Sequence, residues 1–492
     1  MHIAYISCEC VPFSKTGGLA DVAGALPEAL CDHGHQVSVY TPYYRVSKTI
    51  DSHAQKIAEG TVPVGTEKVP YVVYKASISK GGATYYLIDN AEYFDREGLY
   101  GDHHGDYVDS CSRFIFFCRA SMAAAQALGK PVDVYHCNDW SSALVAIYLK
   151  LSYANHPFHG EAASLFTIHN LSYQGLFWYW DWPLLNLPWK NFNWKELEFH
   201  GKMNLLKGAL VHSDLLSTVS PTYADEIQTP EYGCGLEGVL SDRKADLFGV
   251  VNGIDTRIWN PQRDPLLPAN FSAEDLTGKA RCKAELLKYF KLPTDKDRPV
   301  IGMIGRLVEQ KGFDIVALSI EELARRDVQL VFLGTGQDKY QAILKRMQEL
   351  YPKQIGVALD YDNSLAHLIE AGSDIFLMPS KFEPCGLNQL YSLRYGTVPL
   401  VRKTGGLADT VVDATPENVK NGTASGFVFE AYTHTALLEA TDRALDMLRK
   451  RPAEWRKLVL TGMKEDWSWT RSAKAYSDLY EKAKAKARTR KV

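Results

Sequence analysis

The chain has 492 residues, of which 46% are hydrophobic and 23% are charged, and its 55 basic and 58 acidic side chains give a net charge of −3. At roughly 100–200 residues per domain, a chain of this length forms two to four domains, each with its own core. The composition excludes disordered and fibrous proteins. The near-neutral charge makes nucleic acid and membrane surfaces poor partners.

The remaining bulk features indicate a cytoplasmic enzyme. No stretch approaches the roughly 18–20 uninterrupted apolar residues that span a membrane. The first residues, MHIAYISCE, form a strand-like run without a secretory or transit pattern. The nine cysteines are thinly spread, which is typical of buried thiols in a reducing compartment and not of a disulfide framework. A mature plastid protein would have the same features, so that location stays open.

Short apolar runs alternate with helical stretches along the chain. Strands are predicted at residues 2–8, 36–41, 132–138, 163–169, 214–219, 299–305, 329–334 and 374–379, and helices at 313–326 and 436–450. The runs are almost continuously apolar, which is typical of parallel strands buried on both faces. Their alternation with helices predicts an α/β fold with doubly wound parallel sheets.

A seven-residue repeat indicates how the chain is divided. Residues 15–21 read KTGGLAD, and residues 403–409 read the same. No short period accompanies this repeat, so we expect two similar α/β halves and not a solenoid. The segment 249–268, rich in Asn, Asp and Pro, marks the boundary between them. We predict an N-terminal domain at residues 1–250, a C-terminal domain at 251–465 and a terminal helix at 466–492.

The terminal segment contains four aromatic residues, Trp467, Trp469, Tyr476 and Tyr480. They indicate a helix that docks on another part of the protein, and we expect it to return to the N-terminal domain. The basic stretch from Lys482 to Lys491 is expected to be a solvated and frayed chain end.

Polar residues follow five of the predicted strands, at the positions where open parallel sheets bind ligands. In chain order they are Lys15, Gly17 and Gly18 after 2–8, Asp139 after 132–138, His169 and Asn170 at the end of 163–169, Arg306 and Lys311 after 299–305, and Glu383, Cys385, Gly386 and Leu387 after 374–379. Since both halves contribute, a cleft between two domains is the simplest explanation.

Together these residues suit the departure of a phosphate leaving group. Gly17 and Gly18 before a helix allow close approach of the backbone and point N–H groups at an anion. A Gly-Gly pair alone would be a plain turn, and the lysines and the arginine favour the anion site. Arg306 and Lys311 supply two positive charges that offset the charge of a departing diphosphate without a metal.

Two residues and one short pattern have several possible roles. Glu383 stabilises a cationic sugar, holds a sugar hydroxyl, or only places a negative charge at the positive end of a helix dipole. His169 is an acid–base group, a hydrogen-bonding wall of the pocket or a core imidazole. Asp360-Tyr361-Asp362 matches the D-x-D pattern of a metal site, but nothing nearby supplies further ligands. We predict no metal and no cofactor.

Longer motifs connect these residues to a known family. The chain contains SKTGGLADVAGALP, FTIHNLSYQG, NGIDTRIWNP, GRLVEQKG and KFEPCGLNQLYSLRYGTVPLVRKTGGLADTV. With these motifs it resembles, essentially end to end, the bacterial glycogen synthases and plant starch synthases. The resemblance implies the GT-B fold, in which two Rossmann-like doubly wound domains face a deep cleft. It also implies retaining transfer of glucose from ADP-glucose to the non-reducing end of an α-1,4-glucan (glycogen, starch or a maltooligosaccharide), with release of ADP.

The resemblance also implies a role for each candidate residue. Lys15 and Gly18 contact the donor diphosphate, with Gly17 and Asp21 in the same loop. Arg306 and Lys311 neutralise the leaving diphosphate, with Gln310 beside them. Glu383 and His169 lie by the transferred glucose, and its hydroxyls and the phosphate are bound by Cys385, Gly386 and Leu387. The sugar pocket is lined by Asp139, Asn170 and Asn252, and Tyr361 stacks on the nucleotide base.

Two positions depart from the family pattern. Ser141 follows Asp139-Trp140 where relatives often have histidine, and Phe94 stands where they often have tyrosine. Neither departure removes a residue that is central to this chemistry.

Three questions stay open at this point. Glu383 either forms a covalent glucosyl intermediate or takes part in a front-face mechanism, with leaving group and acceptor on one side. We favour the front-face route because the leaving phosphate can accept the acceptor's proton. A second reading is another retaining GT-B transferase, which uses a small acceptor or UDP-glucose. A third is an inactive glucan-binding homologue, although such a protein need not keep Lys15, Arg306, Lys311 and Glu383.

Overall fold

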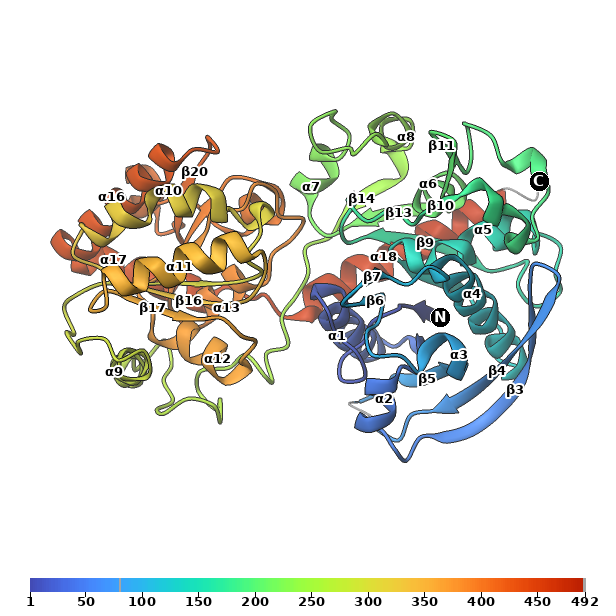
Figure 1. Cartoon of the computed structure of the whole chain (residues 1–492), viewed down its shortest axis with the longest axis horizontal. Helices are drawn as coiled ribbons and strands as arrows, with labels where there is room; N and C mark the ends of the chain where they lie inside the picture. Colours follow the sequence, from blue (N-terminus) through green and yellow to red (C-terminus); the bar gives the residue numbers. More distant parts are fainter. Residues whose placement is uncertain (79–80, 490–492) are drawn as a thin grey trace. The chain divides into compact units, whose positions relative to one another are not determined.

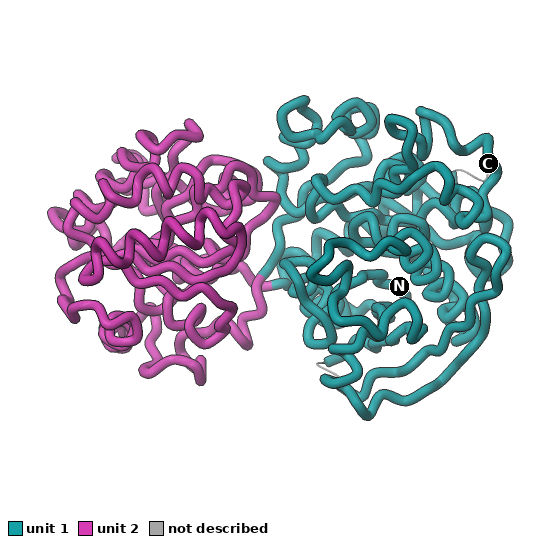
Figure 2. Tube along the Cα trace, viewed as in Figure 1, with its two compact units in different colours: residues 1–253, 469–492 teal, residues 254–468 magenta. Residues whose placement is uncertain are grey.

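The computed structural model describes residues 1–78 and 81–489. Two compact units make up the chain: unit 1 is Met1–Gly253 with Trp469–Val492, and unit 2 is Ile254–Ser468 (Figure 2). Each unit is built around its own mainly parallel sheet, which confirms the predicted α/β class. Within the described residues, no helix combines the length and the apolar character that a membrane crossing requires.

The main sheet of unit 1 has nine strands. Seven run parallel in the order β14-β13-β9-β8-β1-β2-β5, and a hairpin of β4 and β3 continues the sheet antiparallel beside β5. The parallel strands are β1 (His2–Ile6), β2 (Gln36–Pro42), β5 (Thr84–Asp89), β8 (Val134–Asn138), β9 (Ala163–Ile168), β13 (Leu215–Thr218) and β14 (Leu247–Gly249). The chain runs outward from β1 to β5 and then returns to β8 on the other side of β1. The strand order therefore reverses between β1 and β8.

The hairpin of β3 (Gln55–Val64) and β4 (Glu67–Lys75) is not among the predicted strands. In β4 the buried residues Val69, Tyr71 and Val73 alternate with more exposed ones. This alternation is the pattern of an antiparallel sheet with one solvated face. A search for continuous apolar runs misses such strands.

Helices cover both faces of this sheet (Figure 1). Ile3 and Tyr5 of β1 pack in a core cluster with α1 (Gly18–Asp32) and α18 (Trp469–Thr489), and the alternate residues Ala4 and Ile6 are also fully buried. Strands β1, β2, β8 and β9 are contacted by α4 (Ser110–Ala127) and α5 (Ala143–Leu151). The sheet is thus doubly wound, as predicted.

Shorter elements complete unit 1. The helices are α2 (Arg45–Ile50), α3 (Ala91–Phe94), α6 (Leu205–His212), α7 (Pro221–Glu226) and α8 (Glu237–Asp242), and the 3-10 turns are η1 (Trp140–Ser142), η2 (Tyr179–Leu185), η3 (Trp189–Asn191) and η4 (Lys244–Asp246). A small antiparallel sheet has the order β10 (Leu176–Trp178), β12 (Lys202–Asn204), β11 (Glu198–Phe199), and β6 (Gly101–Asp102) pairs with β7 (Gly105–Asp106).

The terminal helix α18 belongs to unit 1 and packs against α1 (Figure 1, red). Tyr480 is buried, and its hydroxyl lies 2.8 Å from Nδ1 of His136. The expectation of a frayed basic end is wrong for the described residues, because the helix continues to Thr489 and Lys484 forms a 2.6 Å ion pair with Asp133. One face of the helix packs in the core of unit 1. Lysines beside that face form ion pairs with acidic residues, as Lys484 does with Asp133.

Unit 2 has a six-stranded sheet in which all strands are parallel. Its order is β17-β16-β15-β18-β19-β20, made of β15 (Val300–Ile304), β16 (Gln329–Leu333), β17 (Ile355–Ala358), β18 (Ile375–Met378), β19 (Val398–Arg402) and β20 (Phe427–Phe429). Counted from β15, this is the order 3-2-1-4-5-6 of dinucleotide-binding sheets. The order reverses between β15 and β18.

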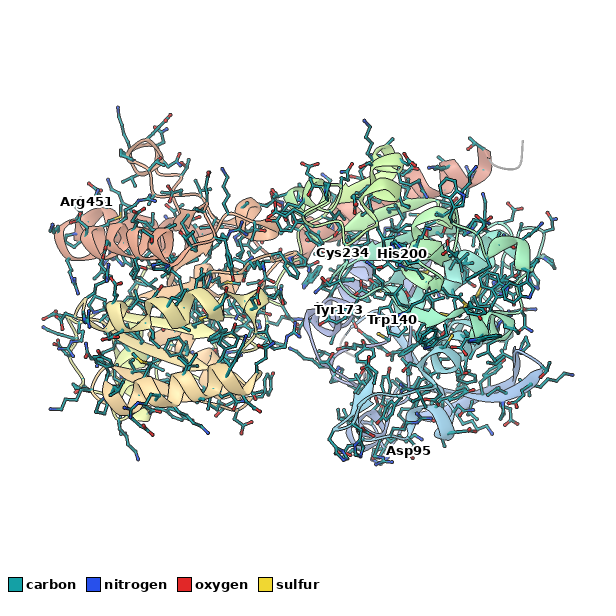
Figure 3. All side chains as sticks on the ribbon, turned by 45° about the horizontal axis from the view of Figure 1, so that its top comes forward. Asp95, Trp140, Tyr173, His200, Cys234 and Arg451 are labelled. Carbon is teal, nitrogen blue, oxygen red and sulfur yellow. The ribbon has the colours of Figure 1, made fainter. Side chains whose placement is uncertain are left out.

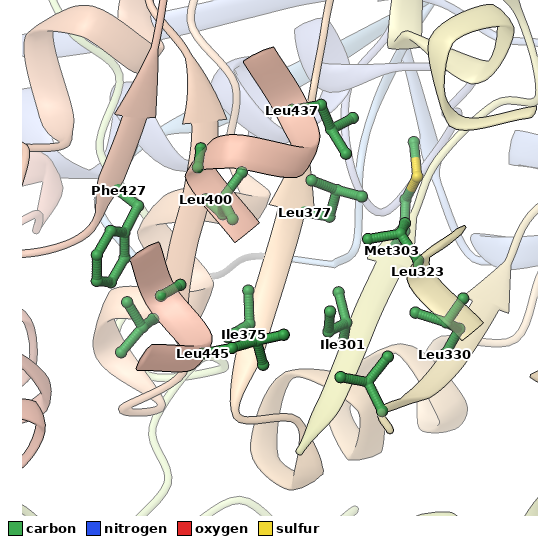
Figure 4. Packing of buried hydrophobic residues seen from close by; sticks show 14 of the residues in the cluster. Ile301, Met303, Leu323, Leu330, Ile375, Leu377, Leu400, Phe427, Leu437 and Leu445 are labelled. Atoms are coloured by element: carbon green, nitrogen blue, oxygen red, sulfur yellow. The ribbon is translucent and has the colours of Figure 1, made fainter. Parts of the chain in front are cut away.

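Alternate residues of these strands enter two cores on opposite faces. The helices of unit 2 are α9 (Thr277–Tyr289), α10 (Phe313–Ala324), α11 (Asp338–Leu350), α12 (Asn363–Gly372), α13 (Asn388–Arg394), α14 (Gly405–Thr410), α15 (Pro416–Asn421), α16 (His434–Lys450) and α17 (Pro452–Lys464), with the 3-10 turn η5 (Glu309–Lys311). Ile301 and Met303 of β15 pack in a cluster with helices α10 and α16 (Figure 4), and Val300 packs in a second cluster with α9 and α12.

Candidate active site

Most of the predicted site residues gather at the point in each sheet where the strand order reverses. In unit 1 the loops after β1 and β8 carry Lys15 to Gly18 and Asp139, and the loop after the neighbouring β9 carries His169 and Asn170. In unit 2 the loops after β15 and β18 carry Arg306 to Lys311 and Glu383 to Leu387. Open α/β sheets bind their ligands at such reversal points. Each unit therefore presents its own group of candidate residues.

The loop before α1 is open to solvent. Residues 15–18 are all exposed, and a Cβ atom added to Gly17 would meet nothing within 4 Å. Nζ of Lys15 lies 2.8 Å from Oδ1 of Asp21, which stands in the first turn of α1. The start of α1 thus combines backbone N–H groups with a lysine held in place, as an anion site requires.

Glu9 supports this loop and is not among the predicted site residues. Its buried carboxylate accepts hydrogen bonds from the N–H groups of Thr16 (2.5 Å) and Gly17 (3.2 Å), from the Thr16 hydroxyl (2.6 Å) and from the Tyr100 hydroxyl (2.7 Å). Two N–H groups before the helix are therefore already used, and an incoming anion meets the helix start from Gly18 onward. The signal in the sequence is an acidic residue three positions after the end of a buried strand.

His169 is held as a neutral ring. Its Nε2 lies 2.9 Å from Oδ1 of Asn138, whose amide nitrogen donates to the carbonyl of Ile6 at 3.0 Å. Since that oxygen can only accept, Nε2 carries the proton and Nδ1 is the acceptor of the ring. Burial lowers the pKa of His169 to about 3. A neutral ring with so low a pKa is a poor acid–base group near neutral pH and a good hydrogen-bonding wall.

Asp139 connects the ends of β8 and β9. Its carboxylate accepts the N–H of His169 at 2.7 Å, and its own N–H donates to the carbonyl of Thr167 at 3.0 Å. Its φ of 56° is unusual for a residue other than glycine. Burial raises the pKa of Asp139 to about 7, although the N–H groups of His169 and Asn170 favour the charged form. Asp139, His169 and Asn170 are thus brought together as predicted neighbours.

Asn252 lies apart from this group, after the edge strand β14. The residue is buried, and in the described part of the chain its Oδ1 has no hydrogen-bond partner. A buried acceptor without a partner destabilises the folded state by about 1–3 kcal/mol. A ligand hydroxyl would satisfy it.

In unit 2 a short ion pair joins the two strand ends. Nζ of Lys311 lies 2.6 Å from Oε2 of Glu383, and the same oxygen accepts a hydrogen bond from the Ser380 hydroxyl at 3.0 Å. The Glu383 side chain is 7% exposed and that of Lys311 is 24% exposed. These two contacts and the burial hold the carboxylate in one orientation.

Arg306 and Gln310 stand beside this pair. Nη2 of Arg306 lies 3.4 Å from Oε1 of Gln310, and the Gln310 amide donates to the carbonyl of Phe382 at 3.1 Å. Arg306 is exposed. The structure therefore brings Arg306, Gln310, Lys311 and Glu383 together.

The second copy of the repeated heptapeptide packs beneath the turn at Glu383. The N–H of Gly406 donates to the carbonyl of Glu383 at 3.1 Å, and a Cβ atom on Gly405 would overlap that same carbonyl oxygen. Residues 404–406 are buried, whereas the equivalent residues 16–18 are exposed; the lysine that begins each copy is exposed in both. The two copies thus have different roles: the first is an open loop, and the second is a support for Glu383.

The turn that follows Glu383 is compact. Cys385 is buried, and Gly386 has a φ of +75°. The Gln389 amide donates to the carbonyls of Cys385 (3.0 Å) and Gly386 (3.1 Å). Leu387 then precedes α13. These contacts set the direction in which backbone groups of the turn point.

Tyr361 and its acidic neighbours do not resemble a metal site. The Asp360 carboxylate accepts the N–H of Tyr361 at 2.7 Å, and the Asp362 carboxylate caps α12 through the N–H of Leu365 at 2.9 Å. Tyr361 itself is 72% exposed. It follows the edge strand β17, so β16 and β15 separate its strand from β18.

The two departures from the family pattern are packing positions. Phe94 is fully buried, with its ring centroid 5.4 Å from that of Tyr44 and 5.9 Å from that of Phe116. Ser141 is buried, and its carbonyl lies 3.3 Å from the sulfur of Cys118.

Comparisons with known proteins cover nearly the whole chain. Residues 2–242 match the family described as the starch synthase catalytic domain, and residues 287–457 match glycosyl transferases group 1. A glycogen synthase of Koribacter versatilis (strain Ellin345) is 48% identical over 489 residues, which is 98% of each chain. A glycogen synthase of Anaeromyxobacter dehalogenans (strain 2CP-1 / ATCC BAA-258) is 47% identical over 481 residues, again 98% of each chain.

Two solved structures have a similar fold. The catalytic domain of starch synthase IV from Arabidopsis thaliana, bound to ADP and acarbose, superposes with a TM-score of 0.90 at 32% identity and covers 98% of this chain and 99% of its own. The sucrose-phosphate synthase of Thermosynechococcus elongatus has a TM-score of 0.59 at 18% identity, over 98% of this chain and 99% of its own, which is a likeness of fold alone.

Proposed function

The chain belongs to the glycogen synthase family and has the GT-B fold, and from this premise we propose that it is an α-1,4-glucan glucosyltransferase that uses ADP-glucose. The transferred glucose joins the non-reducing end of a glucan, its anomeric configuration is retained, and ADP leaves. The observation that carries the proposal is the Lys311–Glu383 pair beside Arg306, at the strand reversal of unit 2. The relatives that match over 98% of the chain are glycogen synthases, which counts against the small-acceptor alternative.

In this proposal the cations of unit 2 stabilise the leaving diphosphate. Arg306 is exposed and free to turn toward an anion, and Gln310 orients its guanidinium. Lys311 has three N–H donors, so it can bind a phosphate oxygen while it keeps its bond to Glu383. Two fixed cations lower the cost of the negative charge that builds on the departing group. They supply the role that a metal ion has in other transferases.

Glu383 acts on the transferred glucose. Its carboxylate shares one oxygen with Lys311 and Ser380, and such pairing makes a carboxylate a weaker nucleophile. We therefore propose that Glu383 stabilises the developing positive charge of the sugar in a front-face reaction, in which the leaving phosphate takes the proton of the incoming hydroxyl. Cys385, Gly386 and Leu387 bind sugar hydroxyls and phosphate through the turn that Gln389 holds.

Unit 1 binds the same substrates from its open loop. Lys15 and Gly18 bind the diphosphate, with Gly17 and Asp21 in the same loop. Nδ1 of His169 accepts a hydrogen bond from a sugar hydroxyl, since Nε2 is already engaged. Other sugar contacts come from Asp139, Asn170 and Asn252, and Tyr361 offers an exposed ring to the nucleotide base. We place this reaction in the cytoplasm.

Release of nucleoside diphosphate tests the function directly. We expect ADP release from ADP-glucose that depends on added glycogen and continues in the presence of a chelator. Activity with UDP-glucose alone would overturn the donor assignment. No release from either donor, by protein shown to be folded, would overturn the enzymatic proposal and favour the inactive homologue.

A further inference from the structure

A fully buried asparagine contacts His169 at the carboxyl end of the sheet of unit 1. Asn138 is the last residue of β8, and η1 begins two residues later at Trp140, which Figure 3 labels. In the parallel ladder Asn138 stands opposite Thr167 of β9. His169 follows Thr167 by two positions, so its side chain lies on the same face of the sheet as that of Asn138. The register of two neighbouring strands thus brings the amide and the ring together.

The amide of Asn138 has one favourable orientation. Its Nδ2 donates to the carbonyl of Ile6 at 3.0 Å, and a carbonyl oxygen can only accept. Its Oδ1 accepts the hydroxyl of Tyr5 at 3.1 Å. Burial raises the pKa of Tyr5 well above its usual value, so this hydroxyl keeps its proton and remains a donor. A rotation of the amide by half a turn would set its oxygen against the oxygen of Ile6.

The oxygen of Asn138 therefore determines which nitrogen of His169 carries the proton. Oδ1 lies 2.9 Å from Nε2 of the ring. Its two lone pairs are then both used, one for Tyr5 and one for His169. Within the described residues Nδ1 of His169 has no hydrogen-bond partner, and the residue is partly exposed. Nδ1 thus keeps a free lone pair for a ligand.

Fixing the proton on Nε2 restricts what the ring can bind. The tautomer of a neutral imidazole depends on its hydrogen-bond partners, and either nitrogen can carry the proton where no partner selects one. Here Nδ1 can only accept. It favours a hydroxyl, which can donate to it. It opposes a fluorine, a carboxylate or a phosphate oxygen, because two groups that only accept would then face each other.

We propose that Asn138 is a positioning residue that fixes the tautomer of His169 and thereby makes the site specific for a sugar hydroxyl at the point that Nδ1 faces. The identity of the sugar, glucose, rests on the proposed function. The substrate class that follows is a neutral sugar with a free hydroxyl at this point. A sugar that carries a carboxylate or a phosphate there is rejected. Asn138 acts through His169 and does not touch the sugar.

The test frees the tautomer while His169 stays in place. In Asn138→Leu, a change to a side chain of similar size, Nε2 of His169 loses its acceptor. The matched control is Tyr5→Phe, which removes the other hydrogen bond to the same oxygen and keeps the contact between Asn138 and His169. Both changes disturb one buried network, so an effect of stability alone would appear in both variants. Thermal unfolding confirms that each variant folds.

The kinetic readout is discrimination between a hydroxyl and a fluorine. We measure kcat/KM for ADP-glucose and for analogues in which fluorine replaces one hydroxyl of the glucose at a time. The hydroxyl next to the reacting carbon is left out, because fluorine there itself slows formation of a cationic sugar. In the unaltered protein and in Tyr5→Phe, we expect one analogue to be rejected about tenfold more strongly than the others.

In Asn138→Leu this additional rejection should disappear, because the freed ring can donate from Nδ1 to the fluorine. The preference among the other analogues should stay as it is in the unaltered protein. Equal rejection of all analogues by the unaltered protein would overturn the proposal. So would a folded Asn138→Leu protein that keeps the preference, or a Tyr5→Phe protein that loses it.

The tautomer is also measured directly and without catalysis. NMR of the full-length protein labelled with ¹⁵N at histidine distinguishes protonated from unprotonated ring nitrogens, and His169→Ala identifies the signals of His169. We expect the proton on Nε2 in the unaltered protein and in Tyr5→Phe, and a mixture of both tautomers in Asn138→Leu. A proton on Nδ1 in the unaltered protein would overturn the proposal, whether or not Asn138→Leu folds.

Failure of the proposed function has a different signature. A folded protein that transfers glucose from no donor, but in which Asn138→Leu alone changes the tautomer of His169, would support the role of Asn138 and overturn the enzymatic proposal. A protein that is active and holds the proton on Nδ1 would overturn the role of Asn138 alone.

Discussion

Nζ of Lys311 lies 2.6 Å from Oε2 of Glu383, although the two residues are 72 positions apart in the chain. The contact exists because β15 and β18 are neighbours at the reversal of the sheet, so the loops that follow them meet. A cation and a carboxylate fixed against each other can act on opposite parts of one substrate: the cation on the leaving phosphate and the carboxylate on the sugar.

Replacing Lys311 by alanine should slow turnover by about 100–1000-fold, because one of two fixed charges on the leaving group is lost. Its removal also leaves Glu383 buried without its cation, so some loss of thermal stability is expected. The rate of ADP release measures the first effect and thermal unfolding the second.

The matched control is Lys403→Ala. It removes an exposed lysine that pairs with Glu430 at 2.6 Å, and exposed pairs contribute little. If Lys311→Ala retained full turnover, the assignment of Lys311 to the leaving group would be wrong.

Glu9→Gln should loosen the loop before α1. The amide that replaces one carboxylate oxygen would face N–H and O–H donors of Thr16, Gly17 and Tyr100, and an unmet buried hydrogen bond costs about 1–3 kcal/mol. We expect the KM for the donor to rise about tenfold, with a smaller change in turnover. Steady-state kinetics at saturating glycogen measure both.

Tyr100→Phe is the graded control for this variant. It removes one of the four donors to Glu9 and leaves both backbone contacts, so its KM should lie between those of the unaltered protein and Glu9→Gln. Equal donor KM values for all three proteins would rule out a positioning role for Glu9.

Much of the fold and part of the site could be predicted from the sequence, for reasons that are local. Strands such as β1 and β15 are buried on both faces, so their apolar runs are continuous and visible. Lys15, Arg306 and Glu383 lie in the loops that follow such strands. What could not be predicted depends on contacts between distant residues. One of the hydrogen bonds to Glu9 comes from Tyr100, 91 positions away, and the end of α18 is held by the burial of Ala483 and Ala487 in the core of unit 1 together with the ion pair of Lys484 with Asp133.

The two copies of the heptapeptide show the same limit. The two copies have the same sequence but differ in burial, because Gly405 packs on the Glu383 turn whereas Gly17 faces solvent. An identical sequence of seven residues therefore predicts a similar local turn but does not predict a similar role.

Asp139→Asn should change how stability depends on pH. Burial raises the pKa of Asp139 from 3.8 to about 7, so between these values the folded state binds more protons than the unfolded state. The shifted pKa of Asp139 therefore stabilises the folded protein at low pH. This contribution is complete below pH 3.8 and is lost as the pH rises through 7. One such proton gives a slope of about −1.4 kcal/mol per pH unit.

The asparagine variant cannot ionise, so its unfolding temperature should fall less than that of the unaltered protein between pH 5 and pH 8. Thermal unfolding of both proteins across this range measures the difference. Parallel curves for the two proteins would show that Asp139 does not titrate here.

His169→Ala should reduce turnover by about tenfold, which corresponds to one lost hydrogen bond. Because burial lowers the pKa of His169 to about 3, the ring is neutral throughout the range from pH 5 to pH 9. The pH–rate profile of the variant should therefore have the same shape as that of the unaltered protein. A profile that loses a limb in this range would identify His169 as an acid–base group instead.

Gly17→Ala and Gly405→Ala form a matched pair at equivalent positions of the repeat. Gly17 has an extended backbone and open space around it, so alanine should leave thermal unfolding almost unchanged. Gly405 has a φ of +43°, and a Cβ atom there would overlap the Glu383 carbonyl oxygen. The backbone strain alone costs about 1–3 kcal/mol, and relief of the overlap must displace the turn that holds Glu383. We therefore expect Gly405→Ala to lower both the unfolding temperature and the turnover, and a variant as stable and active as Gly17→Ala would show that the second copy does not support Glu383.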